Sequence, residues 1–410
     1  MHKYRNYEPT YLHDFGYPEG EAQRSNETNT FWQNENYLSY DQQFGAHHIK
    51  ATAGASWQQH VNDYSWFNAR QFSTDFYKYN NMNVSEEYDH PSSNYYDWTM
   101  NSYFARGTYT YDDKYTFTLT GRVDGSSRFG EDNKYGFFPS GGFSWLASEE
   151  NFMSNVDVID RLRFRTSYGV TGNTEIGLYN SLATISSGTT LINGQLQSSS
   201  SVARLSNPEL EWEKTHQADV GIEVGAFDNA ISLEVDYYYK LTTDLLLNRP
   251  IPATTGFTSM TDNIGEVLNR GVDVKLTTRN IRSSEFNWST TFTVNYNKNT
   301  VEQLGAQNED MFPGPWWLAG SQTILSVGEP VNSFWGYIRK GTWDLDEAEE
   351  AAKVNKKPGM KKYSDEKHIL GKGFPDYRGS LINRFQIGQF DLMVDLQFSY
   401  GAEILQQFLH

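Results

Sequence analysis

The stretch Arg161-Leu162-Arg163-Phe164-Arg165-Thr166-Ser167-Tyr168-Gly169-Val170 decides the fold of this chain. Its odd-numbered positions begin with three arginines, while the even-numbered positions carry Leu, Phe, Thr and Tyr. Because successive side chains of a β-strand point to opposite faces, the stretch predicts a strand with one charged and one largely apolar face. If the apolar face meets lipid, a one-residue slip places the arginines there, at about 2–4 kcal/mol each near the bilayer midplane. The register is therefore strongly specified.

The same alternation recurs in the ranges 114–124, 217–224, 231–239, 286–296 and 390–399. Alternation alone also fits a soluble β-sandwich whose apolar residues point inward. However, these strands reach about ten residues, beyond the usual soluble length of about 5–6, and their apolar sets end in Tyr, Phe or Trp, as interfacial girdles do. The sequence therefore predicts an all-β fold, an antiparallel transmembrane β-barrel of which this chain forms about 12–14 strands.

Composition and charge exclude several classes of protein. The net charge of −17 argues against a nucleic-acid partner, since binding phosphates needs a basic face. The absence of Cys removes disulfides, thiol nucleophiles and Cys-based zinc sites. No apolar run approaches the roughly 18–20 residues of a spanning helix, whereas barrel strands need only about 9–11. The start Met1-His2-Lys3-Tyr4-Arg5 is not followed by the apolar segment of a signal peptide.

Connections between the expected strands alternate in length. Short links are expected at 41–47, 112–113, 227–229, 280–285 and 387–389, and long loop-like segments at 59–98, 171–213, 241–270 and 298–377. The last long segment is expected to contain another strand pair around 331–340. Short periplasmic turns opposite long extracellular loops are the asymmetry of an outer-membrane barrel.

Several motifs then resemble the SusC/RagA family of TonB-dependent outer-membrane transporters. They are Arg122-Val123-Asp124-Gly125-Ser126-Ser127-Arg128-Phe129-Gly130 with Tyr135-Gly136-Phe137-Phe138-Pro139-Ser140, then Tyr168-Gly169-Val170-Thr171-Gly172-Asn173, Asn207-Pro208-Glu209-Leu210-Glu211-Trp212-Glu213-Lys214-Thr215, Asp236-Tyr237-Tyr238-Tyr239-Lys240 and Asn295-Tyr296-Asn297-Lys298-Asn299. Their order and spacing extend the resemblance from about residue 34 to residue 401.

The resemblance implies that residues 1–410 are the C-terminal portion of a barrel of about 22 strands in the outer membrane of a Gram-negative bacterium. Signal peptide, TonB box, plug and final strands are then expected to be absent from the chain. The implied function is import of an oligosaccharide or peptide, with a SusD-like surface lipoprotein and the TonB complex as partners. No cofactor is implied. Met360 stands where the family segment normally has Asp after Pro358-Gly359, so no metal site is expected there.

Candidate site residues lie on the expected lumen face. They are Arg122, Asp124, Arg128, Arg161, Arg163, Arg165, Glu234 and Asp236. Packing against a plug is favoured over direct substrate contact, since a barrel interior is polar whether or not it touches cargo. Asp124-Gly125-Ser126-Ser127 also fits an ordinary turn. Trp316 and Trp317 could form an extracellular aromatic contact with cargo or partner, although girdle or loop packing is favoured.

No catalytic residue or metal site is predicted. The chain has no Gly-x-Ser-x-Gly elbow, His-Glu-x-x-His motif or phosphate-binding loop. His47 and His48 are adjacent in an expected strand and point to opposite faces. The acids of 344–350 lack the spacing of a calcium loop. Alternatives to the importer are a passive porin or surface adhesin, and a secreted glycan-binding β-sandwich.

Overall fold

The computed structural model describes residues 2–8, 20–313 and 322–405, and nearly all of its regular structure is β-strand. The strands of the main sheet are β1 His2–Glu8, β2 Glu21–Phe44, β3 His47–Phe72, β4 Ser85–Tyr88, β5 Ser92–Tyr111, β6 Tyr115–Ser126, β7 Tyr135–Leu146, β8 Ile159–Asn173, β11 Glu213–Ala226, β12 Ile231–Pro250, β13 Ser259–Arg282, β14 Phe286–Leu304, β18 Tyr377–Ile387 and β19 Phe390–Tyr400.

The remaining elements lie in connections. The strands are β9 Thr184–Ile192, β10 Gln195–Arg204, β15 Thr323–Ile324, β16 Ser333–Thr342 and β17 Lys361–Lys372. The short helices are η1 Lys78–Asn80, η2 Met82–Val84, η3 Glu131–Asn133, η4 Ala147–Glu149, η5 Asn151–Met153, η6 Ala253–Thr255, η7 Leu345–Glu347 and α1 Ala348–Lys353. In the described parts of the chain, no helix has the length and apolarity needed to cross a membrane.

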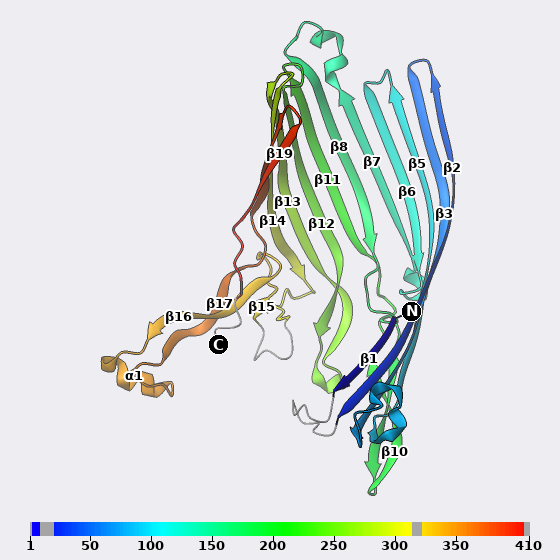
Figure 1. The fold of residues 1–410 in the computed structure, drawn as a ribbon, viewed down its shortest axis with the longest axis vertical. Helices are drawn as coiled ribbons and strands as arrows, with labels where there is room; N and C mark the ends of the chain where they lie inside the picture. Colours follow the sequence, from blue (N-terminus) through cyan, green and yellow to red (C-terminus); the bar gives the residue numbers. More distant parts are fainter. Residues whose placement is uncertain (1, 9–19, 314–321, 406–410) are drawn as a thin grey trace.

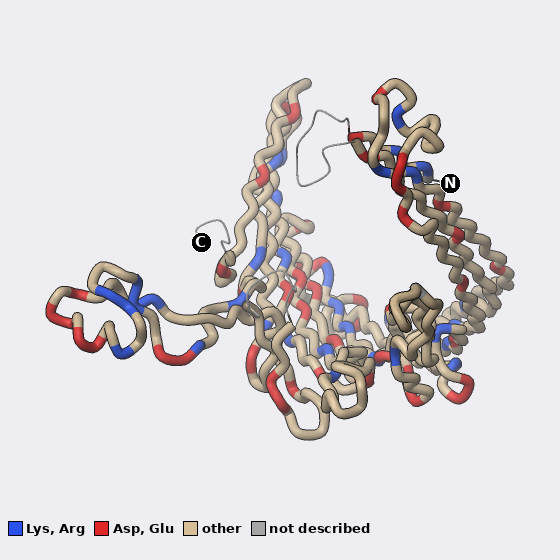
Figure 2. Tube along the Cα trace, turned by 90° about the horizontal axis from the view of Figure 1, so that it is seen from below, with Lys and Arg blue, Asp and Glu red and all other residues tan. Residues whose placement is uncertain are grey.

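Fourteen strands form one antiparallel sheet whose order follows the chain. The order is β1-β2-β3-β5-β6-β7-β8-β11-β12-β13-β14-β18-β19, with β4 paired to β3. Seen along the strands, the sheet is a wall that curves around an open space (Figure 2). The predicted antiparallel fold of about 12–14 strands is confirmed.

The register places apolar and polar side chains in separate rows across the wall. One row joins Trp145, Phe164, Ile222, Val235, Val274 and Val294, and the next joins Ser144, Arg165, Gly221, Asp236, Asp273 and Asn295. On the apolar face Leu119 is 71% exposed and Val220 is 59% exposed. So broad an apolar surface is unsuited to water and fits a lipid bilayer, which leaves the polar face to line the lumen.

Short turns gather at one end of the wall, the upper end in Figure 1. Asp112 and Asp113 connect β5 to β6 with φ angles of 54° and 53°, a left-handed conformation that Asp tolerates in tight turns. Gly388, with φ of 57°, does the same between β18 and β19. The turns at 112–113, 227–229 and 387–389 fall where the sequence predicts them.

The strands run further toward the opposite end than the sequence predicts. The ranges 59–98 and 241–270 were expected to be mainly loop, yet β3 continues to Phe72, β12 to Pro250, and β13 begins at Ser259. Beyond the apolar band both faces of a strand can be polar, so alternation disappears although the backbone ladder continues. The prediction that these whole ranges are loop is therefore wrong, because strands occupy much of each range.

The strand pair expected around 331–340 is present as β16 and β17, but it lies outside the wall. Together with β15 it forms a separate three-stranded sheet, and Figure 1 shows β16, β17 and α1 projecting sideways from the wall. β14 pairs directly with β18, from Phe286 opposite Ile387 to Tyr296 opposite Tyr377. The wall is thus continuous without this projecting hairpin.

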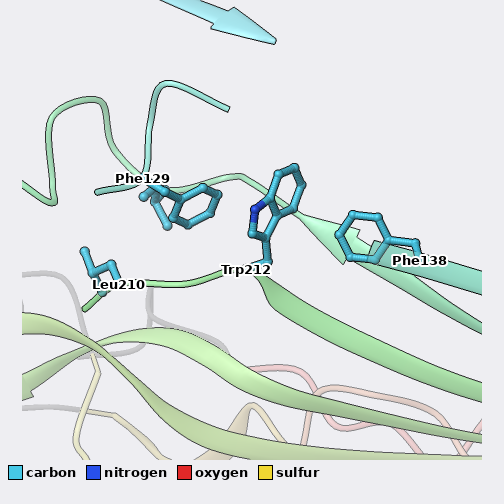
Figure 3. Packing of buried hydrophobic residues seen from close by; sticks show 5 residues of the cluster. Phe129, Phe138, Leu210 and Trp212 are labelled. Atoms are coloured by element: carbon cyan, nitrogen blue, oxygen red, sulfur yellow. The ribbon is translucent and has the colours of Figure 1, made fainter. Parts of the chain in front are cut away.

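A small buried core ties the long connections together at the loop end. Phe129, Phe138, Ile176, Leu210 and Trp212 form it, with the ring of Trp212 at 5.2 Å from the rings of both Phe129 and Phe138 (Figure 3). The Trp212 indole donates a hydrogen bond of 3.2 Å to the backbone oxygen of Lys134. Segments preceding β7 and β11 are thereby fixed to each other.

Candidate functional site

A ladder of ion pairs follows the polar face across β8, β11, β12 and β13. Arg161 Nε lies 3.0 Å from one carboxylate oxygen of Glu223, and Arg163 Nη1 lies 3.7 Å from the other. On the next strands, Lys275 Nζ lies 3.1 Å from Glu234 Oε1. Arg161, Arg163 and Glu234 of the predicted site residues therefore each lie beside a residue of opposite charge on one face of the wall.

Arg165 reaches across a whole strand to its partner. It lies on β8, its ladder partner on β11 is Gly221, and the residue opposite Gly221 on β12 is Asp236. Arg165 Nη2 donates to both carboxylate oxygens of Asp236, at 3.1 and 3.0 Å. A Cβ atom on residue 221 would lie 2.0 Å from Asp236 Oδ1, so the glycine leaves the room in which the pair forms.

Asp236 also stands directly opposite a second acid, Asp273 of β13. Like charges in this position repel each other, and each carboxylate accepts hydrogen bonds from a residue outside the pair, of which only the one to Asp236 carries a positive charge. Asp236 accepts from Arg165, and Asp273 accepts a 2.6 Å hydrogen bond from the Asn295 amide. The acids thus stay available to water while their charge is partly balanced.

Two neighbouring hollows lie along this ladder on the polar face of the wall. One of about 490 Å³ is lined by Arg165, Asp219 and Ser167, and one of about 420 Å³ by Lys275 and Arg378, while Asp236 and Asp273 line both. Such a surface can donate and accept hydrogen bonds, and can bind either sign of charge. It has the chemistry to bind a polar polypeptide segment or a hydroxyl-rich small molecule.

Arg122, Asp124 and Arg128 form a second group, nearer the loop end. Arg122 Nε donates to Asp124 at 2.8 and 2.7 Å, and its Nη2 donates to Ser102 Oγ at 3.0 Å. Asp124 lies inside β6, which keeps pairing with β5 as far as Ser126, so the interpretation of 124–127 as a turn is wrong for its first residues.

Arg128 holds the neighbouring loop in place. Its Nη1 donates to the backbone oxygens of Thr174 and Ile176, at 3.0 and 3.3 Å, and its guanidinium lies 5.1 Å from the centre of the Trp98 ring. Burial lowers the pKa of Arg128 from its ordinary value. These contacts orient the loop end around the small core.

The predicted aromatic contact, two unpredicted residues of the hollows and the question of a metal site remain. Trp316 and Trp317 lie outside the described residues. Two further residues line the hollows but are not among the predicted site residues. Asp219 lies on the polar face of β11, within the predicted strand 217–224, and Arg378 lies on β18, where Gly379 and Asn383 interrupt the apolar alternation. Across residues 2–8, 20–313 and 322–405, no three His, Cys, Asp or Glu side chains gather in a way that could hold a metal ion.

A wall of antiparallel strands with an apolar outer face and a charged inner face defines an outer-membrane β-barrel protein. The chain belongs to the TonB-dependent receptor β-barrel family: the family model described as "TonB dependent receptor-like, beta-barrel" matches residues 2–401. It is therefore a protein of the outer membrane, and the resemblance inferred from its motifs is confirmed.

Relatives place it among SusC- and RagA-like receptors. It is 36% identical to TonB-dependent receptor P3 of Formosa agariphila over 93% of the chain and 39% of that protein. Against TonB-dependent receptor SusC of Bacteroides thetaiotaomicron the identity is 29%, over 91% of the chain and 38% of SusC. The solved RagAB peptide transporter matches with a TM-score of 0.79 and 25% identity, over 94% of this chain and 43% of that one. The chain thus spans about two fifths of the length of these curated relatives.

Proposed function

We propose that this chain forms part of the wall of an active nutrient importer, which takes up an oligosaccharide or a peptide across the outer membrane. It works with a SusD-like surface lipoprotein and draws its energy through TonB. The observation that carries the proposal is the charged ladder on the polar face. Membership of a TonB-dependent family and the likeness to SusC and to the RagAB peptide transporter support it.

The ladder suits a lumen whose polar contents, a plug segment or cargo, bind and leave repeatedly. Arg161, Arg163, Arg165, Glu234 and Asp236 are partly exposed, so incoming groups can exchange with water at their charges. A purely passive pore needs only a wet lining. A ladder with both signs can hold a plug segment by many weak contacts and release it when TonB pulls. We assign the ladder first to the plug and second to cargo.

The second group acts at the entrance. Arg122 and Asp124 join β6 to β5, and Arg128 orients the 174–176 segment beside the small core and through it the rim that receives cargo. Trp316 and Trp317 belong to a connection between β14 and β15, and we propose them as aromatic contacts for cargo or for the lipoprotein.

Uptake in cells tests the proposal. Cells that lack the gene, and cells complemented with it, are supplied with labelled oligosaccharides and peptides, with and without an uncoupler and in a strain lacking TonB. We expect uptake of one of these classes to require the gene, TonB and an energised membrane. Gene-dependent uptake that persists without TonB and with the uncoupler would favour the passive porin.

The role of the ladder needs matched variants. Arg165→Gln combined with Asp236→Asn removes one pair from its centre, and Asp112→Asn combined with Lys114→Gln removes a 2.9 Å pair at a short turn. We expect the first variant to lower uptake several-fold at equal surface abundance, and the second to leave it unchanged. Equal uptake by both variants would remove the ladder from the mechanism.

A further inference from the structure

The apolar face of β13 and β14 ends in two cations at its loop end. On β14 this face presents Phe292, Val294 and then Tyr296, and the next residue on the same face is Lys298. On β13 it presents Val274, Val272 and then Arg270. Arg270 and Lys298 are direct ladder partners, and both are exposed.

Neither cation is neutralised by the described protein. Within residues 2–8, 20–313 and 322–405, no ion pair and no side-chain hydrogen bond involves Arg270 or Lys298. Like charges directly opposite each other on a sheet destabilise it unless something else compensates them. The neighbour of Arg270 on β12 is Tyr239, which carries no charge of its own at neutral pH.

The surroundings of Lys298 do not supply the missing negative charge. Lys298 lines a hollow of about 200 Å³ together with Lys372, Phe374 and Asp376. Asp376 is already paired with Lys372, so the residues that line this hollow carry a net positive charge. An anion from outside the chain would balance it.

The depth of the two cations indicates which anion. Between Trp288 and Tyr296 the lipid face of β14 covers about the length that a barrel strand needs to cross hydrocarbon, and Trp and Tyr mark the headgroup level at each end. Lys298 is the next residue after Tyr296 on this face, two residues further along β14, and Arg270 is its ladder partner on β13. Both lie toward the end with the long connections, which in an outer-membrane barrel is the side of the outer leaflet. A cation costs little at this depth but much at the midplane.

We propose that Arg270 and Lys298 bind the phosphate group of a phosphorylated glycolipid in the outer leaflet. The guanidinium of Arg270 can donate two hydrogen bonds to one phosphate, and the ammonium of Lys298 adds a compact charge beside it. Tyr296, one step toward the midplane on the same face, contacts the lipid below its headgroup, and Tyr239 lies beside Arg270 at the level of the cations. The site anchors the wall to the leaflet at β13 and β14.

Lipid binding by the purified, complete protein tests the site, with bound lipid counted by native mass spectrometry. The probes are phosphorylated lipid A and the same lipid A after enzymatic removal of its phosphates. The variant Arg270→Gln with Lys298→Gln is compared with Arg279→Gln and Arg384→Gln, which removes the same charge from exposed arginines on the polar face. Heat-modifiable electrophoretic mobility verifies folding.

We expect the lipid-face variant to bind phosphorylated lipid A at least about tenfold more weakly, a loss of about 1.4 kcal/mol, while the polar-face variant binds it like the parent protein. Dephosphorylated lipid A should bind the parent protein and both variants equally and weakly. Equal binding of both lipids by the parent, or no effect of the substitutions, would overturn the site. If the double variant does not fold, the single variant Lys298→Gln is measured in its place. We then expect a smaller loss of affinity for phosphorylated lipid A.

Inorganic phosphate distinguishes a lipid site from a site for free phosphate. An excess of it should displace phosphorylated lipid A only weakly, because the acyl chains contribute on the apolar face. Complete displacement at equal phosphate concentration would overturn the lipid as the ligand. Because the readout is bound lipid and not uptake, this test can fail while the importer stands, and the reverse also holds.

Discussion

At the scale of single residues, one position decides whether a side chain meets lipid or the lumen. Leu119 and Thr118 are neighbours on β6, yet Leu119 is 71% exposed on the apolar face while Thr118 Oγ1 lies 3.3 Å from Thr108 Oγ1 on the polar face. Such pairs allow the assignment of the two faces to be tested with an identical substitution on each.

We expect Leu119→Arg to impair insertion far more than Thr118→Arg. A charged side chain on the lipid face costs about 2–4 kcal/mol near the midplane, whereas in the lumen Arg can stay hydrated. Folded protein in outer membranes, measured by heat-modifiable mobility, should fall steeply for Leu119→Arg only. Equal losses for the two substitutions would contradict the facial assignment.

Trp212 is the residue on which the small core depends. Trp212→Ala removes the ring that contacts both Phe129 and Phe138 and leaves the Lys134 oxygen without its donor, at a local cost of roughly 3–5 kcal/mol. We expect the 174–212 connection to become sensitive to added protease while the wall stays folded. Phe152→Ala, at an exposed aromatic, is the control and should change neither property.

At the scale of elements, the projecting hairpin carries a pH-dependent cap. Asp344 and Glu347 form a capping box at the start of η7, and Lys362 of β17 forms an ion pair with Glu347. The hydrogen bond from Lys362, followed by that from the Asp344 backbone, lowers the pKa of Glu347, and the same pair raises the pKa of Lys362.

Because the folded pKa of Glu347 is lowered, the pair stabilises the hairpin tip above the ordinary carboxyl pKa of about 4.5 and is lost as the pH falls through the lowered value. We expect amide hydrogen exchange over 344–354, corrected for its intrinsic pH dependence, to lose protection in this acid range. In Lys362→Met the protection should be low already at neutral pH. An identical pH profile for variant and parent would exclude the ion pair as the cause.

The sequence predicts the strands and their two faces well inside the bilayer. It predicts the extent of the strands outside the bilayer less well. Between aromatic girdles the alternation of strands such as β8 and β12 is imposed by lipid on one side and water on the other, so residues 161–168 identify both faces. Beyond the girdles β3 and β12 continue without that constraint. The ion pair between Arg165 and Asp236, which lie on either side of Gly221, depends on the register of three strands. The sequence of any one strand does not reveal that register.

At the scale of the whole molecule, the wall and the projecting hairpin are separate structures. β14 is paired to β18 over its full membrane span, and Pro330 and Pro375, on either side of β16 and β17, line the same small hollow. The chain therefore leaves the wall and returns to it at nearly one place.

We expect replacement of residues 331–374 by a short Gly-Ser linker to leave the barrel assembled. The register between β14 and β18 needs none of the removed residues. Heat-modifiable mobility and outer-membrane abundance should match those of the parent protein. Loss of the folded band would show that the hairpin contributes to assembly of the wall, contrary to this interpretation.

Because the hairpin leaves the wall and returns to it at one place, its tip is a suitable site for an epitope tag. The hairpin of β16, β17 and α1 extends sideways from the wall, as Figure 1 shows. An epitope inserted between Asn355 and Pro358, next to the end of α1, would be carried clear of the lumen. Antibodies against the epitope could then measure the abundance of the protein in the outer membrane.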